Sequence, residues 1–169
     1  MCPVNITNSI ITASSTLLAV GITLYFTNRR EKNKFLQDLK LKEYIDLETF
    51  YVNLLSSIEM TIRYTERGEN YKDLFQEKSI ISAKANLIAP EEINQKLNDV
   101  SELMFIWSSY YRKSLPSKIG DTGFGMISNK DIEFKEKADQ EFPKLQQEIG
   151  QLVNLIKQEL KTQKERLKK

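Results

Sequence analysis

The feature that most constrains this chain is an uncharged stretch from Ile10 to Phe26, IITASSTLLAVGITLYF. No charged residue precedes it, and the first charges along the chain are Arg29 and Arg30. As a helix this stretch is roughly 25 Å long, and the uncharged run from Val4 to Thr27 is roughly 36 Å long. Because the hydrocarbon core of a bilayer is about 30 Å thick, we predict one transmembrane helix with a domain attached after it.

Basic residues follow the predicted span and none precedes it. Four of them fall between positions 29 and 34, namely Arg29, Arg30, Lys32 and Lys34. Positively charged flanks of a span stay in the cytoplasm. We therefore predict a single-pass protein of the inner (cytoplasmic) membrane, with its N-terminus outside, its domain in the cytoplasm and lipid as a partner. A cleaved signal peptide is the alternative, but it needs a basic n-region and a small-residue cleavage site, which this sequence lacks.

One side of the predicted span is polar or small, whereas the other side carries mainly leucine and isoleucine. The polar side consists of Asn8, Thr12, Ser15, Thr16, Ala19 and Thr23. Such residues are typical of places where membrane helices approach closely or face water. Ser and Thr can also bond back to the carbonyl one turn earlier. The pattern indicates either such back-bonding or self-association, and a water-lined oligomeric pore is one form of the latter.

The rest of the chain predicts an all-α fold. We expect residues 1–28 to hold the span and residues 29–169 to form a cytoplasmic domain resembling a four-helix bundle. Apolar residues at three- and four-residue steps predict helices over about 29–67, 70–88, 90–115 and 131–168. Nothing breaks the helix between Thr27 and Arg67, so the first helix can continue from the span, and Gly68 ends it. Pro143 should kink the last helix or mark its true start.

The third predicted helix has the most regular pattern. Its heptad positions are Ile93, Leu97, Val100, Met104, Trp107 and Tyr111. More apolar residues surround this stripe, which predicts a helix that is central in the bundle or has a second partner such as another subunit. The candidate subunit-interface residues are Trp107, Tyr110, Tyr111 and Phe124.

Residues 116–130, PSKIGDTGFGMISNK, interrupt the helical pattern with three glycines. The preferred interpretation is an interhelical loop, with Phe124, Met126 and Ile127 available to a neighbouring subunit or the lipid surface. A phosphate-binding loop is the alternative, although the fragment is not a Walker motif and no strand is predicted before it. The end of the last helix, from Lys157, is basic. Its cations either complement the helix dipole or attract anionic lipid.

The composition argues against an enzyme. The chain has no histidine and one cysteine, Cys2, so His-based catalysis, His metal sites and cysteine metal sites are excluded. A net charge of +2 is too small to attract nucleic acid in bulk, so a nucleic-acid partner is not expected. Arg63 and Arg67, one turn apart, either receive a phosphate or form a solvated helix end. We predict no catalytic, cofactor or metal site.

The layout of a charge-free N-terminus, one span, a basic run and a helical bundle ending in a basic helix resembles small single-pass accessory proteins of prokaryotic defence systems. In particular it is similar to the helical membrane protein that accompanies an RNA-targeting CRISPR effector. The resemblance implies a HEPN-like helical fold and a membrane pore built from several copies. The HEPN nuclease signature needs a histidine a few residues after an arginine. Because this chain has none, Arg63 and Arg67 inherit no nuclease role.

Three functions are therefore compared. The first is a membrane-anchored homo-oligomer that forms a pore or perturbs the membrane in antiviral defence. The second is a membrane-anchored scaffold that recruits a cytoplasmic protein partner. The third is a nucleotide sensor that uses the glycine-rich loop or the arginine pair. The sequence favours the first over the second, and both over the third.

Overall fold

The computed structural model describes the backbone of residues 4–69, 72–118 and 125–167, and the side chains of residues 20–69, 79–116 and 125–167. It contains four α-helices: α1 (Val4–Glu66), α2 (Lys72–Ile88), α3 (Glu91–Lys113) and α4 (Asn129–Leu167). Two short strands, β1 (Ser117–Lys118) and β2 (Gly125–Met126), pair antiparallel with Ser117 opposite Met126. The chain packs into two units, residues 1–45 and residues 46–168.

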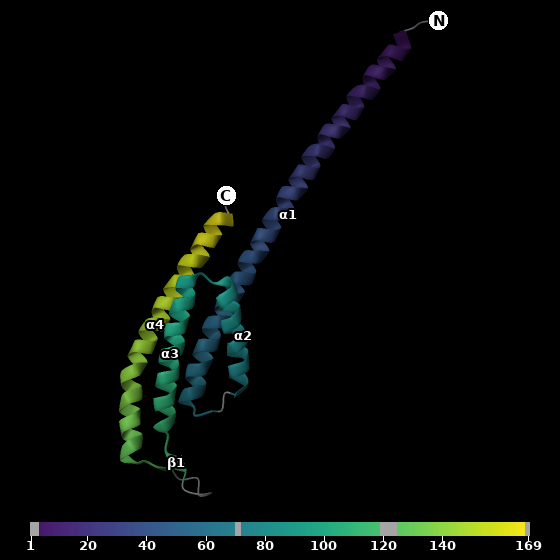
Figure 1. The fold of residues 1–169 in the computed structure, drawn as a ribbon. Coiled ribbons are helices and arrows are strands. Elements are labelled where there is room, and N and C mark those ends of the chain that lie inside the picture. The colour runs from purple at the N-terminus through teal and green to yellow at the C-terminus, as the bar shows by residue number, and fades with distance from the viewer. Residues whose placement is uncertain (1–3, 70–71, 119–124, 168–169) are drawn as a thin grey trace. The chain divides into compact units, whose positions relative to one another are not determined.

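The second unit is a bundle in which α2, α3, α4 and the later part of α1 lie side by side (Figure 1). All four helices contribute to one apolar core, and α3 and α4 share an extensive contact. The all-α fold and the packing of four helices are therefore confirmed. The core side chains are Phe50, Tyr51, Leu54, Ile58, Ala85, Ile93, Leu97, Val100, Met104, Trp107, Ala138, Leu145, Leu152 and Ile156.

The heptad stripe of α3 is the part of the core that the sequence predicts best. Its residues from Ile93 to Trp107 at these positions are all buried, and Tyr111 is half-buried at the end. Pro90 precedes the first turn, where its carbonyl accepts hydrogen bonds from the amides of Ile93 and Asn94. Glu91 and Glu92 lie in that turn, where carboxylates stabilise the positive end of the helix dipole.

Gly68 ends α1 in the way the sequence predicts. Its φ is +67°, and its amide bonds to the Thr65 carbonyl while the amide of Glu69 bonds to the Tyr64 carbonyl. These two hydrogen bonds form a Schellman motif, in which glycine is favoured because other residues are strained at positive φ. A Cβ at this position would also lie 3.2 Å from Cδ1 of Leu115.

The last helix begins at a capping box and runs through Pro143. Ser128 and Asp131 form a capping box, because the Ser128 amide bonds to Asp131 Oδ2 and the Asp131 amide bonds to Ser128 Oγ. α4 begins at Asn129 and continues through Pro143. The alternative that Pro143 marks the true start of the last helix, with residues 131–142 as a separate segment, is therefore wrong. Proline removes one backbone hydrogen bond, while Ala138 and Leu145 on either side stay fully buried and hold the helix on the core.

The β1–β2 pair lies within the segment for which the sequence predicts an irregular loop. A Cβ on Gly125 would lie 2.8 Å from Cβ of Pro116, so the two ends of this hairpin approach too closely for a side chain there. The glycine therefore has a packing role. Residues 119–124, which include the predicted interface residue Phe124, lie outside the described part of the chain.

The first unit consists of α1 up to Ile45, and the helix has no break between Val4 and Glu66. Among the residues that the structure describes, no helix carries an apolar stretch of the length that crossing a membrane requires. Residues 10–19 of the predicted span lie outside the residues whose side chains are described. The boundary at residue 28 marks the expected membrane surface and stays a prediction.

Candidate functional site

The basic residues after the predicted span form an exposed cluster on α1. Arg29, Arg30, Lys32 and Lys34 are all exposed, and none forms an ion pair within the described part of the chain. Just before them, the rings of Tyr25 and Phe26 are 64% and 61% exposed, with centroids 5.7 Å apart in an edge-to-face arrangement. The cluster therefore presents an aromatic pair followed at once by unpaired positive charge.

The predicted polar face of the span cannot be followed along its length. The side chains of Asn8, Thr12, Ser15, Thr16 and Ala19 lie outside the described residues, and Thr23 is exposed. Within residues 20–26 the apolar side chains Val20, Ile22 and Leu24 are also 50–64% exposed. The assignment of these residues to pore lining or span packing stays a prediction.

The residues expected at a subunit interface are used inside the bundle. Trp107 is only 2% exposed, and its ring centroid lies 5.5 Å from that of Tyr111 and 5.2 Å from that of Phe142. Tyr110 stacks on Phe134 with centroids 6.3 Å apart. Trp107 is therefore a core residue of a single chain, whereas Tyr110 and Tyr111 are half-buried and keep part of their surface open.

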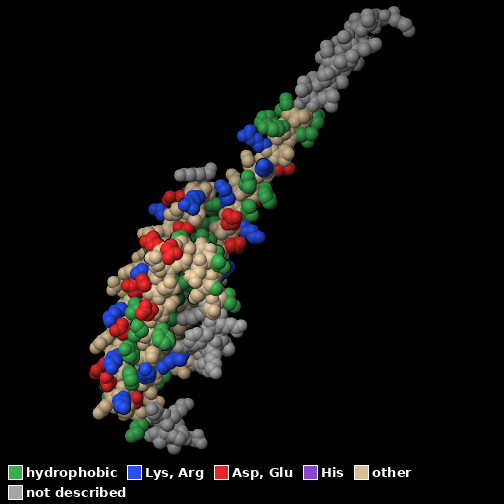
Figure 2. All heavy atoms as spheres, viewed as in Figure 1, with side chains coloured by type: hydrophobic (Ala, Val, Ile, Leu, Met, Phe, Trp, Pro, Cys, Tyr) green, Lys and Arg blue, Asp and Glu red, His purple; other side chains and the backbone are tan. Residues whose placement is uncertain are grey.

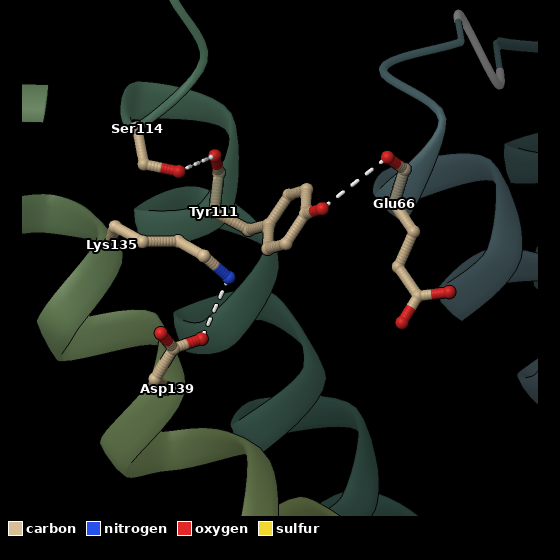
Figure 3. Close-up of polar contacts among 5 residues, drawn as sticks. All are labelled: Glu66, Tyr111, Ser114, Lys135 and Asp139. Atoms are coloured by element: carbon tan, nitrogen blue, oxygen red, sulfur yellow. Dashed lines mark hydrogen bonds and ion pairs between the residues drawn. The ribbon is translucent and has the colours of Figure 1, made fainter. Parts of the chain in front are cut away.

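Tyr111 joins three helices, as Figure 3 shows. Its hydroxyl donates a hydrogen bond of 3.3 Å to the carbonyl of Glu66 at the end of α1. The Nζ atom of Lys135 on α4 lies 4.8 Å from its ring centroid and also bonds to Asp139. Ser114 donates to the Tyr111 carbonyl and closes the last turn of α3. These contacts give Tyr111 a structural role in the single chain.

A groove of about 700 Å³ lies between α1 and α2 in the bundle. Phe50 contributes to its lining, with Lys84 Nζ 5.4 Å from the ring centroid. Ile80 on α2 also lines the groove and is 64% exposed, and Leu87, further along α2, is 85% exposed. The remaining lining residues are mostly small and polar: Asp46, Thr49, Asn53, Ser56, Ser57, Met60 and Ile81.

Sequence reasoning did not find this groove, although a signal existed. Ile80 and Leu87 are seven residues apart and so share one face of α2. The core-facing residues Ile81 and Ala85 lie on another face. A second apolar face on a helix that already buries one indicates a second contact partner.

The paired arginines at the end of α1 are partly neutralised. Arg63 pairs with Glu59 and Arg67 lies 3.8 Å from Glu69. Both arginines remain exposed at 63% and 65% of their side chains. This arrangement matches a solvated helix end. Within the described residues, no group of three histidine, cysteine or carboxylate side chains has the geometry to hold a metal ion.

Tyr51 is a buried titratable side chain of the bundle with a strongly perturbed pKa. It is 1% exposed, and its hydroxyl has no hydrogen-bond partner within the described residues. Burial, with a further contribution from Glu159 on α4, raises the pKa of Tyr51 from 10.0 to about 12. The phenol therefore stays neutral inside the core.

The end of α4 carries a line of exposed lysines. Lys157, Lys161 and Lys164 are spaced by four and three residues and form no ion pair within the described residues. Elsewhere on the viewed face of the bundle, acidic and basic side chains are interspersed (Figure 2). The line is consistent both with the helix dipole and with attraction to an anionic surface.

Comparison of the chain with models of protein families, with curated proteins and with solved structures finds no match.

Proposed function

We propose that this chain is a single-pass, membrane-anchored helical protein that associates with copies of itself. The observation that carries the proposal is the unbroken course of α1, which joins the uncharged stretch to the bundle without a linker. Exposed apolar side chains from Val20 to Phe26 are followed within four residues by Arg29 and Arg30. An aromatic pair beside a basic run is typical of the boundary of a membrane span.

Self-association is supported by apolar surface that the single chain leaves uncovered. Ile80, which lines the groove, and Leu87 lie on one face of α2 and are each more than half exposed. Exposed apolar faces of this kind mark contact sites. The further step, in which associated spans enclose a conducting path as the resemblance implies, depends on the predicted polar face from Asn8 to Thr23.

The experiment that tests the anchor is extraction of the full chain from membranes with alkaline carbonate. We expect the natural chain to stay in the membrane pellet. Replacing Leu17 and Leu18 by lysine should release it, because a lysine near the centre of a span costs about 2.5–3.5 kcal/mol. The matched control replaces Leu36 and Leu39 by lysine, because both are already exposed on α1, at 44% and 43%. Release of the natural chain, or equal release of both variants, contradicts the anchor.

The groove favours a second function, that of an adaptor which holds a cytoplasmic protein at the membrane. Its mixture of apolar and small polar lining residues suits a helix or peptide of another protein. A photo-crosslinking residue at Ser56, which lines the groove, separates the two functions in cells. An adduct with the mass of two copies supports self-association, whereas an adduct with a different protein supports the adaptor.

A further inference from the structure

One face of α1, directly after the exposed aromatic pair, combines three cations with two amides. Phe26, Arg30, Asn33 and Gln37 follow each other at steps of four, three and four residues, so they lie on one face of the helix. A shallow surface groove of about 580 Å³ on this face is lined by Phe26, Arg29, Arg30, Asn33, Lys34 and Gln37. We call these six residues the phosphate face.

The cations of the phosphate face have no carboxylate partner among the residues that the structure describes. Arg29, Arg30 and Lys34 are exposed and form no ion pair within the described residues. On α4, by contrast, Lys135 and Lys137 each bond to a carboxylate one turn away. The phosphate face therefore keeps its full positive charge for an external anion.

We propose that the phosphate face binds the phosphate of an anionic phospholipid headgroup, an inference that rests on the proposed membrane anchor. If Phe26 marks the edge of the hydrocarbon, Arg30 lies roughly 6 Å and Lys34 roughly 12 Å further along the helix axis. The headgroup layer of one leaflet is about 5–8 Å deep. Because helical side chains tilt toward the N-terminus, Asn33, Lys34 and Gln37 lean back toward that layer.

Lys32 distinguishes a built site from general attraction of positive charge to a negative surface. It is two residues from both Arg30 and Lys34 and therefore points to the opposite side of the helix. Lys32 and Lys34 are both exposed lysines at almost the same depth. Removing either changes the net charge by one, but only Lys34 lines the groove.

The test uses the full chain reconstituted in vesicles of phosphatidylcholine with a fifth of the lipid as phosphatidylglycerol. Spin-labelled versions of each lipid report the fraction held at the protein surface, and their ratio gives the preference for the anionic lipid. We expect a preference in the natural chain that falls about fivefold in Lys34→Gln and in Arg30→Gln. It should be unchanged in Lys32→Gln, and excess inorganic phosphate should not abolish it.

Other results would overturn either the phosphate face or the membrane anchor. Equal losses in the Lys32→Gln and Lys34→Gln variants, or no preference in the natural chain, overturn the site. Loss of the preference in excess inorganic phosphate also overturns it, because the ligand is then free phosphate. If the chain does not float with vesicles of phosphatidylcholine alone, the anchor itself has failed. That outcome is separate from failure of the phosphate face, in which the chain floats but holds both lipids equally.

Discussion

The Nζ atom of Lys96 lies 2.6 Å from Oε2 of Glu148 and joins α3 to α4 across an extensive helix contact. Both side chains are mostly covered, at 21% and 23% exposure, and Lys96 also lies 3.2 Å from Asp99 on its own helix. The hydrogen bond to Glu148 is the main cause of the raised pKa of Lys96. The charged form of Lys96 therefore stabilises the folded state.

This pair predicts a pH-dependent contribution to stability. Because folding raises the pKa of Lys96 above its ordinary value of 10.5, its stabilisation is complete below that pH and is lost as the pH rises through the raised pKa. We expect Lys96→Gln to lower the urea midpoint at pH 8 and to differ less from the natural chain at pH 11. Lys144→Gln removes an exposed pair within α4 and should have little effect. A pH-independent difference for Lys96→Gln would contradict the assignment.

The second prediction concerns the unpartnered hydroxyl of Tyr51. A buried hydroxyl without a hydrogen bond costs free energy, so we expect Tyr51→Phe to stabilise the bundle by about 1 kcal/mol. The substitution should also remove a pH effect. Between pH 10 and about 12 the unfolded tyrosine ionises while the folded one stays neutral, so the free energy of unfolding falls across that range.

Urea titrations from pH 8 to pH 12 check the Tyr51 prediction. Tyr44→Phe, at a half-buried position on α1, serves as the control. A loss of stability in Tyr51→Phe would show that the hydroxyl has a partner after all.

The third prediction compares Gly68, which has a positive φ and little space for a side chain, with Gly150, where a side chain has room. Gly68→Ala should destabilise the bundle by about 1–2 kcal/mol, because alanine is strained at positive φ and its Cβ would press on Leu115. Gly150 lies on an exposed face of α4, and a Cβ added there would meet no atom within 4 Å. Gly150→Ala should stabilise by about 0.5–1 kcal/mol. Thermal or urea unfolding of the two variants measures both changes, and equal effects would refute the account of Gly68.

The fourth prediction uses Cys2, the one cysteine of the chain. If the N-terminus lies outside, a maleimide that cannot cross membranes should label Cys2 in intact spheroplasts. The same reagent should not label a cysteine placed at the exposed position Lys144 until the membrane is lysed. The reverse pattern would invert the orientation.

Much of the bundle is readable from the sequence because its helices have long, regular apolar stripes. Ile93 to Trp107 on α3, and Leu145, Leu152 and Ile156 on α4, are buried at the positions that periodicity predicts. The glycine at position 68 and the proline at position 90 mark helix ends for simple steric reasons. These features are local, so one sequence is enough to identify them.

Other features depend on contacts between distant parts of the chain. Two-residue strands such as β1 and β2 are too short to show alternation. A large aromatic side chain such as that of Trp107 is typical of a subunit interface, but here Phe142 from α4 packs against its ring. The α1–α2 groove cannot be predicted without knowing how far apart the two helices lie. The capping box of Ser128 and Asp131 is different, because its spacing is a local signal that the sequence does contain.

The measurement that tests the central claim most directly is the protein mass of the full chain in detergent, determined by light scattering. One chain has a mass of 19.7 kDa. We predict a discrete multiple of this mass, and a lower mass when Ile80 and Leu87 are both replaced by serine. Phe105→Ser, which removes a side chain that is 75% exposed on α3, should leave the mass unchanged. A mass of one chain for the natural protein would contradict self-association.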